Sequence, residues 1–111
     1  MQFIYDGNFY KAIRVTGPKH NLLGLSFGDI DINAEIVALE IANGEVESVE
    51  ANDVMEQVKA GVANANMELG VDYKIVSIQY VPSDSPSKTV YAELAKEIVK
   101  RLANKNEFVR V

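Results

Sequence analysis

The stretch NDVMEQVKAGVANANMELGVDYKIVSIQYV, from Asn52 to Val81, decides the fold because its hydrophobic period changes halfway along. Asn52 is a preferred N-cap residue and Gly70 a preferred C-terminal stop, so we expect a helix from Asp53 to Leu69. The apolar residues of that helix recur at the spacing of one helical face: Val54, Val58, Val62, Ala65 and Leu69. After Gly70, the β-branched and aromatic run Tyr73–Val81 predicts a strand.

Gly61 lies inside the apolar stripe of this helix, where glycine costs about 1 kcal/mol of helix propensity relative to alanine. We expect its missing side chain to let the helix approach the sheet closely. A second helix is predicted to begin at Ser85-Pro86, with serine as the cap and proline in the first turn, and to run to about Ala103. Its inward positions are Val90, Leu94, Ile98 and Leu102. The closing run EFVRV predicts a short strand.

The N-terminal part predicts strands. Aromatic and β-branched residues surround Asp6-Gly7-Asn8, which is a strong turn signal, so Met1–Thr16 reads as a β-hairpin. A two-residue turn there puts Phe3 and Tyr5 on one face with Tyr10 and Ala12. The run LLGLSF, residues 22–27, predicts a third strand with Leu23, Leu25 and Phe27 on one side.

The segment NAEIVALEIANGEVESVE, residues 33–50, allows two interpretations. Asn33 and Gly44 can bound a short helix over 34–42. Alternatively, Asn43-Gly44 forms a type I′ turn that joins two strands. We favour the hairpin, because a helix over 34–42 would be apolar nearly all round. In the hairpin, Glu40 lies directly across from Glu47, with Glu45 beside them.

These elements predict one globular domain over residues 1–111, of class α+β. We expect an antiparallel-dominated sheet, in the order β-β-β-β-β-α-β-α-β, with two amphipathic helices packed on one face. The chain has no cysteine, which removes disulfides, thiolate catalysis and cysteine-ligated metals. No apolar run reaches the roughly 20 residues that span a bilayer. We therefore expect no membrane partner, no cofactor, no metal, and a cytoplasmic location.

Charge is distributed unevenly along the chain, whose formal net charge is -5. Between Asn21 and Val58 there is no lysine, arginine or histidine, but there are nine carboxylates. A nucleic-acid reader normally displays a basic stripe instead, so nucleic acid is an improbable partner. Glu40, Glu45 and Glu47 are the residues that we expect to face a basic protein partner.

The loops offer a weaker set of candidates. His20 is the only histidine, and Ser83, Ser85 and Ser87 follow the strand that ends near Val81. No serine lies in a G-x-S-x-G elbow, and Pro18-Lys19-His20-Asn21 is typical of a solvated turn, so we predict no catalytic residue. The helix start near Ser85, assisted by Lys88, suits an anion, but the loop lacks the glycines of a phosphate cradle.

Two further patterns have a structural explanation that we prefer. Asp29, Asp31, Asn33 and Glu40 match four positions of an EF-hand calcium loop, but Ala34 replaces the required glycine and no helix precedes Asp29. Five tyrosines can form an exposed aromatic surface, although a half-buried rim around the core is the commoner arrangement. They are Tyr5, Tyr10, Tyr73, Tyr80 and Tyr91.

The sequence thus favours a small acidic binding or regulatory domain without catalytic activity, such as an inhibitor or adaptor for a basic protein. The alternative is a small-ligand-binding protein or enzyme that uses the His20 loop and the Ser83–Ser87 loop. A subunit of a homo-oligomer is compatible with the first hypothesis.

Overall fold

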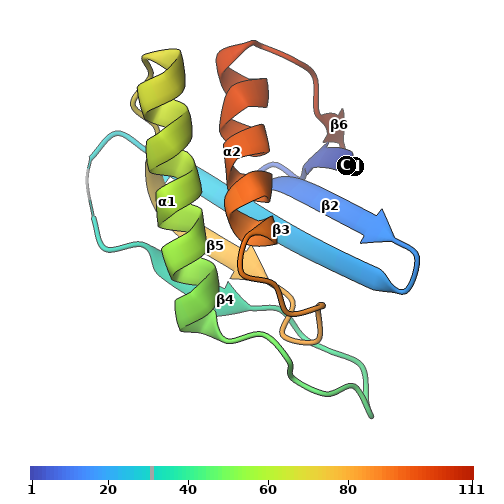
Figure 1. Ribbon diagram of the computed structural model, residues 1–111. Coiled ribbons are helices and arrows are strands. Elements are labelled where there is room, and N and C mark those ends of the chain that lie inside the picture. The colour runs from blue at the N-terminus through green and yellow to red at the C-terminus, as the bar shows by residue number, and fades with distance from the viewer. Residues whose placement is uncertain (31) are drawn as a thin grey trace.

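The computed structural model describes residues 1–30 and 32–111, and Figure 1 shows their arrangement. The described elements, in chain order, are β1 (Gln2–Tyr5), β2 (Tyr10–Thr16), β3 (Lys19–Gly28), β4 (Glu35–Ala38), α1 (Ala51–Leu69), β5 (Lys74–Tyr80), α2 (Val90–Ala103) and β6 (Val109–Arg110). The chain is therefore α+β, as predicted, but one of the expected strands, over 45–50, is not among the described elements.

The strands form one sheet in the order β4-β5-β3-β2-β1-β6. The four central strands are antiparallel, whereas β4 runs parallel to β5 and β6 runs parallel to β1. The sheet is mixed, so our prediction of an antiparallel-dominated sheet with its strand order was wrong. The reason is that α1 connects β4 to β5 as a crossover, and a crossover is what a parallel pair requires.

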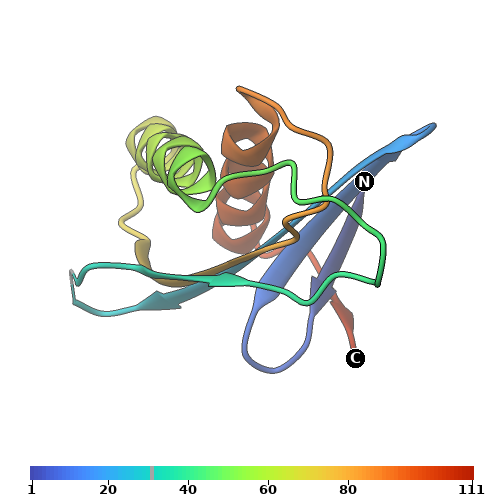
Figure 2. The ribbon, with the colours of Figure 1, turned by 90° about the horizontal axis from the view of Figure 1, so that it is seen from below.

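Both helices pack on the same face of the sheet, as predicted (Figures 1 and 2). The core between the layers is apolar and fully buried at Leu23, Leu25 and Ile78 of the sheet, at Val54 and Val58 of α1, and at Leu94 and Ile98 of α2. Val90 and Leu102 are only half-buried, because Tyr91, Ala95 and Val99 turn inward beside them. In the described part of the chain, neither helix has the length and apolarity needed to cross a membrane.

Gly61 does allow a close approach, but to a different neighbour from the one we predicted. A Cβ atom built on Gly61 would overlap the backbone carbonyl of Ala92 in α2. The glycine therefore brings the two helices together rather than a helix and the sheet. A side chain at Gly61 would have to push α1 away from α2.

Both helices end where predicted, α1 at Gly70 and α2 at Ala103, but their first residues differ from the predicted ones. This glycine caps α1 in the left-handed conformation with φ of 67°. At the start of α1, the N-cap is Glu50 and Asn52 lies within the first turn. Helix α2 begins at Val90 with Thr89 as N-cap, so Ser85-Pro86 belongs to the preceding loop. Propensity located the helices, and at the start of α2 the side chains of Ser87 and Gln57 bind the first N–H groups.

The N-terminal hairpin has the predicted faces. Phe3 pairs with Ala12, and Tyr5 pairs with Tyr10. Four residues separate its strands, and the N–H of Asp6 donates to the carbonyl of Phe9 (3.3 Å) across Gly7-Asn8. The Asp6 carboxylate accepts hydrogen bonds from the backbone N–H groups of Asn8 (2.9 Å) and Phe9 (2.8 Å). Local side-chain bonds of this kind favour a turn over a continued strand.

The predicted hairpin over residues 35–50 is wrong in its second half. Glu35–Ala38 forms strand β4, but it pairs with β5, and residues 39–50 have no regular structure. The N–H of Glu45 donates to the carbonyl of Ala42 (3.1 Å), and Gly44 has φ of 87°. Asn43 lacks a positive φ, so this turn has the pattern of type II rather than the type I′ that joins hairpin strands.

Candidate functional site: an acidic ridge on an anchored loop

Six exposed carboxylates follow one another between the end of β4 and the second turn of α1. We call this set the acidic ridge; its members are Glu40, Glu45, Glu47, Glu50, Asp53 and Glu56. In Figure 1 the segment that carries most of them swings out past the ends of β4 and β5 before it returns to the start of α1. The charge imbalance in the sequence therefore falls on exposed residues of one segment.

The ridge carboxylates have no cationic partner within residues 1–30 and 32–111. The ion pairs of that part of the chain all lie elsewhere: Lys11–Asp6, Arg14–Glu93, Lys74–Asp72, Lys96–Glu68 and Lys100–Glu97. Val46, in the middle of the ridge, is 74% exposed. An exposed apolar side chain among uncompensated carboxylates is a combination that suits contact with another protein.

The ridge segment is held in place although it contains no strand or helix before residue 51. The N–H of Leu39 donates to the carbonyl of Tyr80 (2.8 Å), and the N–H groups of Ser48 (2.7 Å) and Val49 (3.0 Å) both donate to the carbonyl of Pro82. The hydroxyl of Ser83 donates to the carboxylate of Glu45 (2.8 Å). The loop after β5 is therefore the support of the ridge.

That loop is anchored in turn by a buried polar network. Asp84, which is 1% exposed, accepts hydrogen bonds at Oδ2 from the N–H of Leu22 (2.7 Å) and from the hydroxyl of Tyr91 (3.3 Å). The amide of Asn21 donates to the carbonyl of Ser85 (2.8 Å) and to the Tyr91 oxygen (3.2 Å). Burial raises the pKa of Asp84 and of Tyr91 above their usual values.

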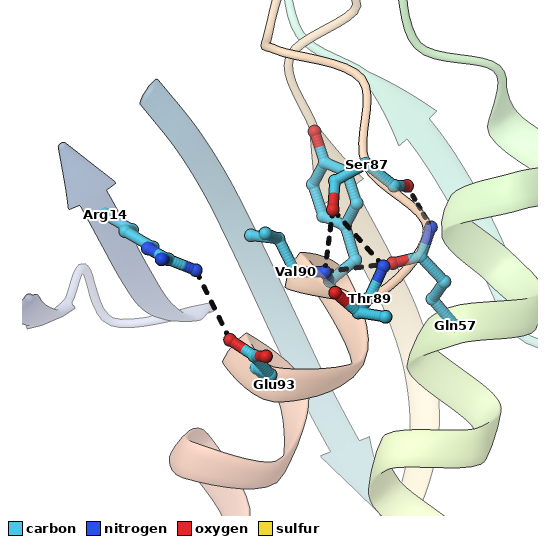
Figure 3. Close-up of polar contacts among 7 residues, drawn as sticks. Arg14, Gln57, Ser87, Thr89, Val90 and Glu93 are labelled. Atoms are coloured by element: carbon cyan, nitrogen blue, oxygen red, sulfur yellow. Dashed lines mark hydrogen bonds and ion pairs between the residues drawn. The ribbon is translucent and has the colours of Figure 1, made fainter. Parts of the chain in front are cut away.

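The start of α2 contributes a second anchor (Figure 3). The Ser87 hydroxyl accepts hydrogen bonds from the N–H groups of Thr89 (3.2 Å) and Val90 (3.1 Å). Gln57 of α1 accepts from the N–H of Tyr91 (3.0 Å) and donates to the carbonyl of Ser87 (2.7 Å). These three N–H groups are thus engaged by the protein itself, which leaves them unavailable to an anion near Ser85 and Lys88.

The structure places the predicted partner-binding residues on the ridge but not in the predicted arrangement. Glu40 and Glu47 do not face each other across a hairpin, because no ladder joins their segments. Glu45 instead contacts Ser83, which brings the acidic ridge to the loop Ser83–Ser87, called the serine loop below. The acidic residues and the serine loop, which the sequence analysis treated as alternative sites, therefore lie in one region.

The loop candidates lie around this region without forming a catalytic arrangement. His20 is exposed, and its carbonyl accepts from the N–H of Ser85 (3.2 Å). Against the larger, opposite effect of burial, the charge of its imidazole also lowers the pKa of Asp84. Lys88 is exposed and shares a hollow of about 250 Å³ with Asp53 and Glu56. It marks the end of the ridge where α1 meets the serine loop.

The residues that sequence reasoning missed are Asp84, Tyr91, Gln57 and Val46. Asp84 lies in the run PSDSPS, whose composition is that of a solvated loop. The neighbouring residues in the sequence therefore do not predict that it is buried. The signal for Tyr91 was present, since it lies next to the apolar stripe of the second helix. Only the packing of α2 over β3 shows that its hydroxyl meets Asp84.

The calcium-like spacing does not become a calcium loop among the described residues. Asp31 lies outside them. Residues 35–38, which would have to wrap around the ion, form the extended strand β4, and no helix precedes Asp29. The described residues contain no group of three side chains placed to hold a metal ion.

The tyrosines do not form an exposed surface. Tyr80 and Tyr91 are buried, and Tyr5, Tyr10 and Tyr73 are half-buried at the rim of the core. Comparison of the chain with protein-family models, with curated proteins and with solved structures finds no match.

Proposed function

We propose that this protein is a non-catalytic binding domain whose acidic ridge docks a basic protein partner. The observation that carries the proposal is the set of six exposed carboxylates without an ion-pair partner in the described part of the chain, on a segment that also exposes Val46. Complementary charge steers association and selects partners, and an apolar residue at the centre of a charged patch adds contact area.

The anchors of the ridge support the proposal independently of its charge. Burial disfavours the charged form of Asp84 and raises its pKa, and the network around this residue fixes a loop rather than the core. Through Pro82 and Ser83, that loop fixes the ridge segment. A surface that is ordered before binding loses less conformational entropy when the partner arrives.

The alternative hypothesis, a ligand-binding protein or enzyme built on His20 and Ser83–Ser87, gains no comparable support. The His20 imidazole is exposed, and the hydroxyls of Ser83 and Ser87 are used to hold the ridge and the start of α2. We therefore do not propose a reaction for this protein.

The test compares two charge reversals of equal size. Glu45→Lys with Glu47→Lys changes the ridge, and Asp29→Lys with Glu35→Lys changes exposed acids outside it by the same net charge. A basic protein captured from the source cell by the wild type is purified, and its affinity for each variant is measured by calorimetry. We expect the ridge variant to bind at least about tenfold more weakly, which corresponds to about 1.4 kcal/mol, and the control to bind like the wild type.

A second variant separates charge from the anchoring bond. Glu45→Gln with Glu47→Gln keeps an acceptor for Ser83 but removes both charges, so we expect an intermediate loss of affinity that shrinks as salt is added. Equal weakening by the ridge and control reversals would show that net charge alone matters. Unchanged binding of the ridge variant would reject the ridge as the docking surface.

A further inference from the structure

A second concave region lies at the other end of α2, where the chain turns toward β6. It is a cavity of about 490 Å³, and the residues that line it include Tyr10, Lys105, Asn106, Phe108 and Arg110. A volume of this size falls within the range of small-molecule sites. The serine loop and the acidic ridge take no part in it, so it is independent of the proposed docking function.

The cavity presents two cations that the described residues leave without an ion-pair partner. Neither Lys105 nor Arg110 forms an ion pair in residues 1–30 and 32–111. Glu107 also lines the cavity, and its carboxylate pairs with neither of them. The guanidinium of Arg110 lies 5.0 Å from the ring centroid of Tyr5, which fixes it over an aromatic face.

Aromatic rings form another part of this region. Tyr10 stacks on Tyr5 with a centroid separation of 4.3 Å and an interplanar angle of 22°. Phe108 meets Tyr10 edge-on at 5.0 Å. Ring contacts of this kind hold the side chains in fixed orientations. The rings of Tyr10 and Phe108 therefore give the cavity an aromatic side that suits a planar ligand group, with Lys105 and Arg110 nearby.

The backbone at Lys105 points to a use for its side chain. Lys105 has φ of 57°, and it is the only non-glycine residue with positive φ in the described part of the chain. The N–H of Asn106 donates to the carbonyl of Arg101 (2.9 Å), and the N–H of Lys105 donates to that of Leu102 (3.1 Å). This is the helix ending whose left-handed position is usually glycine. Here a lysine occupies that position, and it lines the cavity.

We propose that this cavity binds a small anion whose phosphate or carboxylate is attached to an aromatic ring. Lys105 and Arg110 bind the oxyanion, and the ring lies against Tyr10 and Phe108. Arg110 offers two parallel donors to an oxyanion, whereas Lys105 acts as a point charge. The ring supplies contact area that a free inorganic anion lacks.

The test titrates the ¹⁵N-labelled protein with phenyl phosphate and with benzoate, which distinguish the two kinds of anion. Phenol and inorganic phosphate serve as controls that each lack one half of the ligand. We expect saturable shifts of the amide signals of Tyr10 and residues 104–110 with at least one of the two ring-bearing anions. The two controls should bind at least about tenfold more weakly.

Three variants make the test specific. Lys105→Gly should weaken binding about tenfold while the melting temperature stays the same or rises, since glycine fits the left-handed position better. Arg110→Gln should weaken binding to a similar extent. Lys59→Gln, which removes an exposed cation on α1, should bind like the wild type. The proposal is overturned if neither ring-bearing anion gives saturable shifts at these residues, or if Lys105→Gly and Arg110→Gln both bind like the wild type.

Discussion

Two aspartates, each in a loop next to the sheet, have pKa values shifted in opposite directions, and the comparison shows how this fold uses carboxylates. Asp6 in the β1–β2 loop and Asp84 in the loop after β5 both accept hydrogen bonds from backbone N–H groups. The N–H groups of Phe9 and Asn8 lower the pKa of Asp6 to about 2, with help from Lys11. Burial instead raises the pKa of Asp84, although the N–H of Leu22 opposes the shift.

The difference shows that burial, rather than the number of hydrogen bonds, decides the sign of the shift. The Asp6 carboxylate remains close to water, so its bonds to N–H groups favour the charged form at little desolvation cost. Asp84 is 1% exposed, so its charge has lost most of its hydration. Asp6 stabilises its own turn, whereas Asp84 ties its loop to the distant strand β3 and to the start of α2.

The largest effect is expected when the buried carboxylate is removed. Asp84→Ala leaves the N–H of Leu22 and the hydroxyl of Tyr91 without their acceptor, and we expect a loss of about 2 kcal/mol in the free energy of unfolding. Urea denaturation measures this loss. Asp84→Asn is the matched control, because its amide oxygen can accept the same bonds, and it should lose less than half as much. A loss below about 0.5 kcal/mol for Asp84→Ala would mean that the network does not hold the loop.

A smaller effect is expected at the exposed turn. Asp6→Ala removes two local hydrogen bonds and the ion pair with Lys11 at 3.1 Å, and we expect a loss of about 1 kcal/mol. Most of this loss should come from the backbone bonds, because exposed ion pairs contribute little. Asp6→Asn keeps an acceptor and should retain most of the stability in the same denaturation experiment. If Asp6→Ala costs more than Asp84→Ala, the contrast between the two loops is wrong.

The smallest effect is the opposite pH dependence of the two groups. The pKa of Asp6 is lowered, so its contribution to stability is present above the ordinary value of 3.8 and is lost as the pH falls toward about 2. The pKa of Asp84 is raised, so its contribution is fully present below 3.8 and is lost as the pH rises through its folded value. Carboxyl ¹³C NMR titration should give midpoints on opposite sides of 3.8. Two midpoints on the same side would contradict this account.

The spacing of apolar residues predicted the secondary structure of most segments and the face that each of them buries. The residues of Asn52–Val81 form a helix and a strand as expected, and Phe3, Tyr5, Tyr10 and Ala12 share the predicted face. The sequence also located the acidic segment correctly, since charge composition is a property of the chain before it folds. The spacing of apolar residues does not show which strands pair with each other in the sheet. For this reason the parallel pairing of β4 with β5 was missed.

The amino-acid sequence by itself determined the two helices, most of the strands and the concentration of negative charge between Asn21 and Val58. Only the tertiary structure decided that Glu45 meets Ser83, that Gly61 lies against Ala92, and that Asp84 is the buried residue of the loop that supports the ridge. The physical reason is the distance along the chain over which each effect acts. Propensity and period act over one or two turns of chain, whereas the burial of a polar group depends on which distant segment packs over it.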